Sequence, residues 1–308
     1  MREVPYRSFA SYLKERFGGL VRKLPIDGGF TCPNRDGSLA WRGCVYCDAE
    51  GGTGRLRELG SPAAQMARFR ADRAGSPRHE QYVAYFQSFS STYASVEVLR
   101  PLYEEALAQP GVVGLSVSTR PDCLPEAVLE LLEEFSHRTW VSVEIGVQSL
   151  REETVAAIGR GHRAEASLAA IGACKERGLF VCAHQILGLP GESREDWLNT
   201  ARGLSAASID AIKLHMLYVV EGTVLADSWR RGEVPLLTMA EYVKGVVDVL
   251  ERVHPNIVVE RMVSDGLLGC TLAPDWLIDT DGKLDKSAFL AEIRREFATR
   301  RSCQGQLA

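Results

Sequence analysis

The sequence has no apolar run long enough to cross a membrane and no apolar core of the kind found in secretion signals. A membrane-spanning helix needs about 20 consecutive apolar residues, whereas residues 1–19, MREVPYRSFASYLKERFGG, carry charges throughout. We therefore expect a cytoplasmic protein that does not associate with membranes. No internal repeat and no low-complexity segment is visible either, so a repeat architecture is excluded.

The chain also has no excess of positive charge. Its 36 Lys and Arg residues against 40 Asp and Glu residues give a formal net charge of −4. This balance argues against a broadly basic nucleic-acid binder but does not exclude a local basic surface. Two stretches are dense in arginine, residues 67–80 and 293–302. Either they are solvated helix faces, or they contact phosphates.

Among the eight cysteines there is no second C-x-x-C pair, and the histidines form no H-x(3–5)-H pair. Three cysteines, Cys32, Cys44 and Cys47, lie in one segment, TCPNRDGSLAWRGCVYC. In the cytosol thiols stay reduced, so such a group is more typical of a metal site than of a disulfide. Three thiolates without a partner pair favour a [4Fe-4S] cluster with one open iron. A zinc site that one histidine completes remains an alternative.

Short β-rich runs recur about every 30 residues, and helical patterns lie between them. The runs expected to form strands are 24–30, 81–87, 112–119, 139–147, 179–187 and 210–217. Apolar residues at helical spacing predict helices over 126–135 and 240–251. The alternation predicts an α/β fold with a parallel sheet, here a partial barrel of six βα units. We expect an N-terminal helical segment (1–23), the partial barrel (24–231) and a mostly helical C-terminal extension (232–308).

The cysteine segment resembles the radical S-adenosylmethionine (SAM) enzymes. The usual family spacing is C-x3-C-x2-C, so the eleven-residue gap after Cys32 is longer. That gap is similar to the spacing in Elongator-type catalytic subunits and closer to the YtqA/YhcC-like group, with its CPNRDG and GCxYC segments. The likeness continues through YFQSFSSTYA (85–94), STRPDCLP (118–125), EIGVQSL (144–150), ILGLPGE (186–192), KLHMLYVVEGT (213–223) and APDW (273–276).

This resemblance implies a partial (β/α)6 radical SAM barrel, with a [4Fe-4S] cluster and SAM as cofactors. The reduced cluster would cleave SAM to methionine and a 5′-deoxyadenosyl radical, which takes a hydrogen atom from the substrate. A one-electron donor such as flavodoxin or ferredoxin is expected.

The resemblance also implies which residues hold SAM. Gln148 and Arg160 stand at the spacing at which relatives of the coproporphyrinogen dehydrogenase type place a ribose contact and a carboxylate contact. An arginine fork pairs well with a carboxylate, and Arg163 is the alternative. 

Three more positions are candidates for contacts with SAM. His184 stands where those relatives carry a ribose-binding Asp, and it could serve the substrate instead. Gly188 would allow close backbone approach to SAM, or its segment is simply a strand-to-helix turn. Gln87 ends the second strand, where many members have a Gly-Gly-Glu segment that this chain lacks. No catalytic residue is assigned.

The substrate is not fixed by the sequence. Charged residues near strand ends either contact the substrate or form ion pairs; they are Arg120, Asp122, Glu144, Lys213 and His215. The resemblance points to remodelling of a tRNA wobble-uridine side chain, with the base splayed into the barrel mouth. A small metabolite or a protein is the alternative substrate, and a non-catalytic zinc-binding scaffold is the alternative from another functional class.

Overall fold

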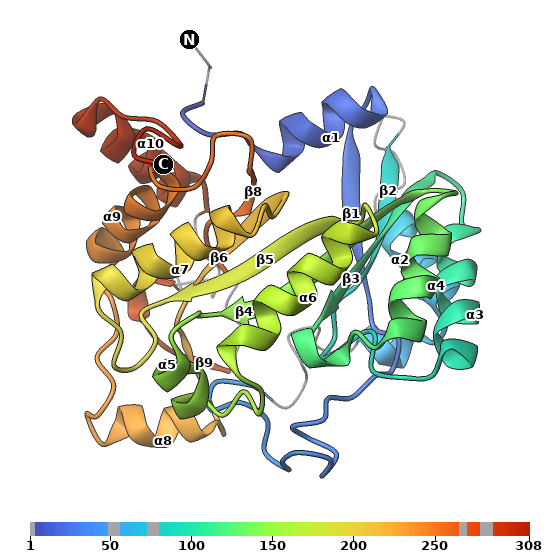
Figure 1. Ribbon diagram of the computed structural model, residues 1–308, viewed down its shortest axis with the longest axis horizontal. Helices are drawn as coiled ribbons and strands as arrows, with labels where there is room; N and C mark the ends of the chain where they lie inside the picture. Colours follow the sequence, from blue (N-terminus) through green and yellow to red (C-terminus); the bar gives the residue numbers. More distant parts are fainter. Residues whose placement is uncertain (1–3, 49–55, 73–79, 265–269, 278–285) are drawn as a thin grey trace.

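A computed structural model describes residues 4–48, 56–72, 80–264, 270–277 and 286–308. The arginine-dense stretch 67–80 therefore lies partly outside the described residues. Within the described ranges, no helix is long and apolar enough to span a membrane. Figure 1 shows a curled sheet with helices packed against its outer side.

Seven strands form one parallel sheet in the order β1-β2-β3-β4-β5-β6-β8. The strands are β1 (Val21–Ile26), β2 (Gln81–Phe86), β3 (Val112–Thr119), β4 (Trp140–Gln148), β5 (Phe180–Leu187), β6 (Ala211–Met216) and β8 (Val258–Arg261). A separate antiparallel pair joins β7 (Val219–Val220) to β9 (Thr271–Ala273). The sheet is thus a half-barrel, and the predicted α/β class is confirmed.

Ten α-helices lie in the described ranges. They are α1 (Phe9–Phe17), α2 (Pro62–Ala71), α3 (Val96–Leu107), α4 (Glu126–Ser136), α5 (Glu152–Ala157), α6 (Ala164–Glu176), α7 (Arg194–Ala206), α8 (Val224–Arg230), α9 (Met239–Leu250) and α10 (Lys286–Arg300). The two helices predicted from apolar spacing, α4 and α9, are confirmed. Each buries its apolar stripe, which in α4 includes Val128, Leu131, Leu132 and Phe135.

Two strand predictions need correction. The first strand spans Val21–Ile26 rather than 24–30, because the chain turns at Gly28–Gly29, where the Asp27 carboxylate accepts a hydrogen bond from the Gly29 amide. A seventh strand, β8, was missed. It comes from the C-terminal part that was expected to be mostly helical, and it extends the sheet beside β6. The division at residues 23/24 and 231/232 stays a prediction.

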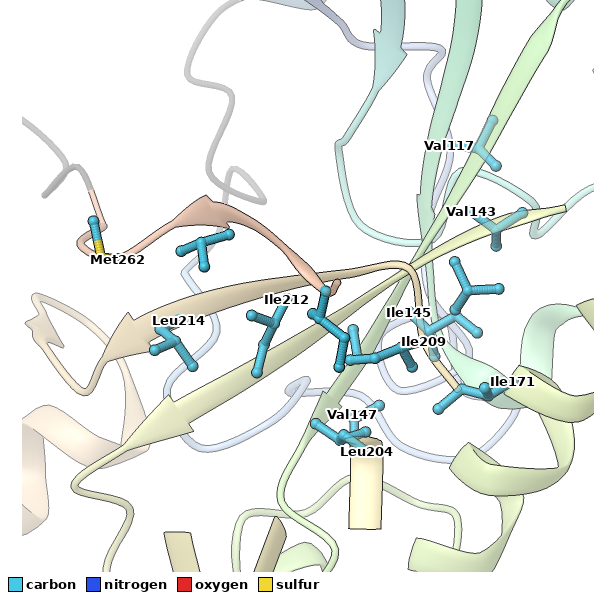
Figure 2. Packing of buried hydrophobic residues seen from close by; sticks show 14 of the residues in the cluster. Val117, Val143, Ile145, Val147, Ile171, Leu204, Ile209, Ile212, Leu214 and Met262 are labelled. Carbon is cyan, nitrogen blue, oxygen red and sulfur yellow. The ribbon is translucent and has the colours of Figure 1, made fainter. Parts of the chain in front are cut away.

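The two faces of the sheet differ in chemistry. Side chains alternate between the faces of a strand, and the outward set is apolar and packs under the helices. Figure 2 shows this packing for Val117, Val143, Ile145, Val147, Ile212 and Leu214, with Ile171 of α6 and Leu204 of α7. The inward set includes buried polar and charged side chains, among them Ser116, Glu144 and Lys213. The main core therefore lies outside the half-barrel, and polar groups occupy its lumen.

Candidate active site

The cysteine-bearing loop follows β1 and lies at the end of the sheet opposite α1 (Figure 1, blue). Tight turns hold its thiols. The Cys32 carbonyl accepts hydrogen bonds from the Arg35 and Asp36 amides, at 2.7 and 3.2 Å, and the Cys47 amide donates to the Cys44 carbonyl at 2.9 Å. Since the first turn closes around Cys32 and the second spans C-x-x-C, the loop presents its three cysteines from two rigid segments.

Asn34 connects this loop by hydrogen bonds to the segment that follows α5. It is 1% exposed, and its amide nitrogen lies 2.7 Å from the Gly159 carbonyl, 3.2 Å from the Arg160 carbonyl and 3.6 Å from Cys44 Sγ. Gly161 has a φ of +74°, and a Cβ there would lie 2.6 Å from Asn34 Oδ1. The close approach therefore requires glycine. Sequence reasoning quoted Asn34 within the cysteine segment without assigning it this role.

Replacing Asn34 with alanine should lower both stability and cluster retention. The change removes a buried donor from two carbonyl oxygens, a loss worth about 1–3 kcal/mol in the free energy of unfolding. Urea unfolding and iron content after reconstitution measure the two effects. Asn256→Ala is the matched control, because Asn256 is exposed and its truncation should cost less than about 0.5 kcal/mol. Equal effects of the two substitutions would contradict the role of Asn34.

One cavity brings together seven of the eight predicted site residues. Cys32, Cys44, Cys47, Gln87, Gln148, Arg160 and His184 all line it. Residues from the cysteine loop and from the ends of β2, β3, β5 and β6 complete the wall. Parallel α/β barrels place their chemistry at these strand ends. Gly188 is not among the lining residues: its φ is +89°, and a Cβ there would meet the Leu237 side chain at 3.2 Å. The ligand roles of all eight stay predictions.

Two arginines, Arg120 and Arg160, give the cavity positive charge. Arg160 is 5% exposed; it donates to the Gly146 carbonyl, and its Nη1 lies 3.5 Å from Cys44 Sγ. Arg120 is 4% exposed and forms a bidentate pair with Asp122, at 2.9 and 2.7 Å. The ion-pair interpretation is thus confirmed for Arg120 and Asp122. Buried guanidinium groups beside the thiols stabilise negative charge in the cavity.

The three thiols differ in how readily they ionise. Burial disfavours the thiolate of Cys44, but the charge of Arg160 and its hydrogen bond outweigh burial, so the pKa of Cys44 is lowered. Burial raises the pKa of Cys32, and burial together with the nearby Cys44 raises the pKa of Cys47 to about 12. Because iron binds the thiolate form, any of these thiols that is still protonated would release its proton on binding.

Several buried polar atoms in the cavity wall lack a protein partner. They are Tyr46 Oη, Arg120 Nη1, Gln148 Oε1, Arg160 Nε and His215 Nε2. Gln148 also has a φ of +71°, a conformation that costs energy for a residue other than glycine. Unsatisfied buried polar atoms and strained backbone are typical of a binding site for a polar ligand. These residues fit SAM, which carries an ammonium group, a carboxylate, hydroxyls and an adenine.

The spacing of the three cysteine sulfurs distinguishes a single zinc ion from an iron–sulfur cluster. Four ligands about 2.3 Å from one zinc ion lie within about 4 Å of one another. Among the described residues, the only His, Cys, Asp or Glu group whose ligand atoms all lie within 4.8 Å is Glu144, Cys182 and His184. The sulfurs of Cys32, Cys44 and Cys47 are thus spaced more widely than one zinc requires. Each cysteine of a cubane cluster binds a different iron, so the wider spacing fits the cluster.

The lumen of the half-barrel contains a network of buried charged side chains. No single sequence motif predicted this network. The Glu144 carboxylate, fully buried on β4, accepts hydrogen bonds from the Lys23 and Lys213 ammonium groups and from Ser116 Oγ at 2.8 Å. Lys213 also lies 2.9 Å from Glu260. For Glu144 and Lys213 the ion-pair interpretation is therefore confirmed as well.

Comparison with known proteins agrees with this site. The family model "Radical SAM superfamily" matches residues 37–204, and the "Radical_SAM C-terminal domain" matches residues 209–297. The chain is 35% identical to YtqA of Bacillus subtilis over 99% of this chain and 93% of that protein. It is 36% identical to YhcC of Escherichia coli K12 over 87% and 86% of the two chains.

More distant similarities extend to Elongator-type proteins. A tRNA uridine(34) acetyltransferase of Dehalococcoides mccartyi is 32% identical over 51% of this chain and 34% of that protein. The solved structure of Elp3 from Methanocaldococcus infernus matches with a TM-score of 0.71 at 18% identity, covering 93% of this chain and 64% of that one. The chain therefore belongs to the YtqA/YhcC-like group of the Radical SAM superfamily, which is related to Elp3, and this membership implies a [4Fe-4S] cluster and SAM as its cofactors.

Proposed function

We propose that this radical SAM enzyme forms a 5′-deoxyadenosyl radical and uses it to modify the side chain of a tRNA wobble uridine. The observation that carries the radical chemistry is the cavity itself. Three cysteines from one loop and two buried arginines converge on the carboxyl ends of a parallel half-barrel. A cluster held by three cysteines keeps one iron open to a ligand.

The residues of this chain would bind and orient the cofactors. Cys32, Cys44 and Cys47 would hold the cluster, and when bound it supplies the electron that cleaves SAM to methionine and the radical. Arg160 would pair with the SAM carboxylate, as a buried guanidinium with an unpartnered Nε. Gln148 would accept a hydrogen bond from a ribose hydroxyl through its unpartnered Oε1. The enclosing wall would keep water away from the radical.

The tRNA substrate is supported by the partial relatives. Proteins named tRNA uridine(34) acetyltransferase align with up to about half of this chain, which favours a shared nucleotide substrate. A nucleobase splayed out of a loop could enter the cavity from the open end of the half-barrel.

Surface charge favours the second candidate, a small metabolite or a protein as substrate. The net charge is −4, and arginines of the second arginine-dense stretch are held in ion pairs. Arg300 of α10 pairs with Asp248 at 2.6 Å and with Glu251 at 3.1 Å, and Arg295 pairs with Glu292 at 2.8 Å. The Arg300 side chain, which two largely buried carboxylates hold, is therefore a poor candidate for a phosphate contact.

Deletion of the gene should change one wobble-uridine nucleoside and leave the other modified nucleosides of bulk tRNA unchanged. Mass spectrometry of digested tRNA measures this change, with accumulation of a precursor nucleoside as the expected result. Wild-type protein should restore the profile, and a Cys47→Ser variant should not. An unchanged profile in a strain without a redundant enzyme would refute the tRNA proposal while leaving the radical chemistry untouched.

A further inference from the structure

His184 connects the charged network of the lumen to the cavity. It lies on β5, where Gly146 of β4 and Lys213 of β6 are its register partners. Its Nε2 lies 2.8 Å from Glu144 Oε2, and His184 lines the same cavity as the cysteines. Among the contacts of the described residues, His184 uses only this nitrogen for hydrogen bonding, so Nδ1 on the opposite side of the ring is left for a ligand.

The charge state of Glu144 decides which nitrogen of His184 carries the proton. Burial disfavours the carboxylate, but Lys213 and Lys23 outweigh burial and hold the pKa of Glu144 well below its usual range. An ionised carboxylate only accepts hydrogen bonds. Tyr85 Oη, at 2.8 Å, and the two ammonium groups already donate to it. The hydrogen atom between His184 and Glu144 must therefore come from His184 Nε2.

His184 Nδ1 is then a hydrogen-bond acceptor, provided that the imidazole ring of His184 is neutral. Burial, followed by the positive charge of Lys213, lowers the pKa of His184 in spite of its contact with Glu144. The ring of His215 packs against it, with centroids 5.2 Å apart, and burial holds the pKa of His215 well below its usual range too. Glu260, Cys182 and Arg261 complete the titratable surroundings. A neutral imidazole has one donor and one acceptor.

The same atoms do not form a convincing metal site. Glu144, Cys182 and His184 have the spacing of a metal-ligand group, but both oxygens of Glu144 are bonded to ammonium groups. A cation there would meet two positive charges at hydrogen-bond distance from the same carboxylate. Cys182 is fully buried, and burial raises its pKa well above the usual range, whereas a thiol must ionise to bind a metal.

We propose that Glu144 is a positioning residue that fixes His184 in its Nε2–H form, so that His184 Nδ1 accepts a hydrogen bond from an N–H or O–H group of the molecule in the cavity. This inference rests on the radical SAM part of the proposed function and not on tRNA. Two molecules carry such a group: SAM, through its ribose hydroxyls, and the substrate, through a hydroxyl or an N–H such as that of a uracil ring. The shared chemistry is a donor directed at a neutral imidazole.

Two substitutions of His184 separate its nitrogens. In His184→Gln, the amide nitrogen can reach the Nε2 position and keep the contact with Glu144, while the acceptor at Nδ1 is lost. In His184→Asn, the shorter side chain keeps polar atoms near Nδ1 but cannot reach Glu144. His137→Gln is the matched control, because His137 is exposed at the end of α4. All three are compared as reconstituted holoenzymes.

The first measurement is the protonation pattern of the imidazole by nitrogen-15 NMR of histidine-labelled, reconstituted protein. We expect His184, identified by its absence in His184→Gln, to carry its proton on Nε2 near neutral pH. Glu144→Gln should shift part of the population to the Nδ1–H form, because an amide can donate as well as accept. A proton on Nδ1 in the wild type would overturn the proposal, whatever the substrate is.

The second measurement is binding and turnover. Loss of one hydrogen bond should weaken SAM binding, or raise KM for the substrate, by about tenfold in His184→Gln. Weaker SAM binding identifies the ribose as the donor; unchanged SAM binding with slower product formation identifies the substrate. Because protonation turns the acceptor into a donor, kcat/KM should fall as pH drops through the lowered pKa of His184 in the wild type but not in His184→Gln. SAM binding, turnover and pH profile that all match the wild type would refute the proposal.

Discussion

Cys44→Ser protein should fail to form 5′-deoxyadenosine above the level of a protein-free control after anaerobic reconstitution and reduction with dithionite. Cys44 is buried in the cavity wall and is contacted by both Arg160 and Asn34. Serine cannot supply a thiolate, so one iron of the cluster loses its protein ligand. Wild-type protein should bind about four iron and four sulfide ions per chain, and the variant should retain much less of both.

Cysteine-to-serine substitutions outside the cavity provide the control. Cys270 and Cys303 are exposed and lie outside the residues that line the cavity, so Cys270→Ser and Cys303→Ser should keep full iron, sulfide and 5′-deoxyadenosine formation. A wild-type protein that binds one zinc ion and no sulfide would instead support the scaffold alternative and contradict the radical chemistry. A loss of cluster in the Cys270 variant would show that thiol count, not position, governs reconstitution.

Strand positions were predictable because each strand of a parallel sheet is a short apolar run bounded by turns. The predicted ranges for β2 to β6 agree with the structure to within a residue at each end. β8 was missed because it is only four residues long, Val258–Arg261, and half of these residues are charged. Its pairing depends on tertiary packing, which the local pattern does not encode.

The candidate site was predictable to the extent that its residues lie in motifs. The cysteines, Gln148 and Arg160 are local features of two segments, and the fold brings both to the cavity. The lumen network was not predictable as a whole, because strands distant in sequence each contribute one or two of its side chains. Lys23 on β1 and Glu260 on β8 become partners at 2.6 Å only when the half-barrel curls. Sheet register and curvature determine this contact, and neither can be predicted from a single motif.

The lumen network predicts a large loss of stability when Lys213 is replaced. The Lys213 side chain is 3% exposed and contacts Glu144, Glu260 at 2.9 Å and Tyr85 Oη at 3.2 Å. Lys213→Met leaves two buried carboxylates with Lys23 as their remaining ammonium partner, and breaking a buried ion pair from one side costs about 3–5 kcal/mol. Urea unfolding of the reconstituted protein should show a loss of this order, whereas Lys244→Met, at an exposed position of α9, should change stability by less than about 0.5 kcal/mol.

A double-mutant cycle tests whether the loss comes from the unpaired charge or from the missing side chain. Lys213→Met combined with Glu144→Gln removes one positive and one negative charge together, so the double variant should be more stable than the sum of the single effects predicts. The coupling free energy should be at least about 1 kcal/mol, because the pair is fully desolvated. Strict additivity would mean that Lys213 and Glu144 do not interact in solution, and Lys23 would then be the ammonium partner that keeps Glu144 ionised next to His184.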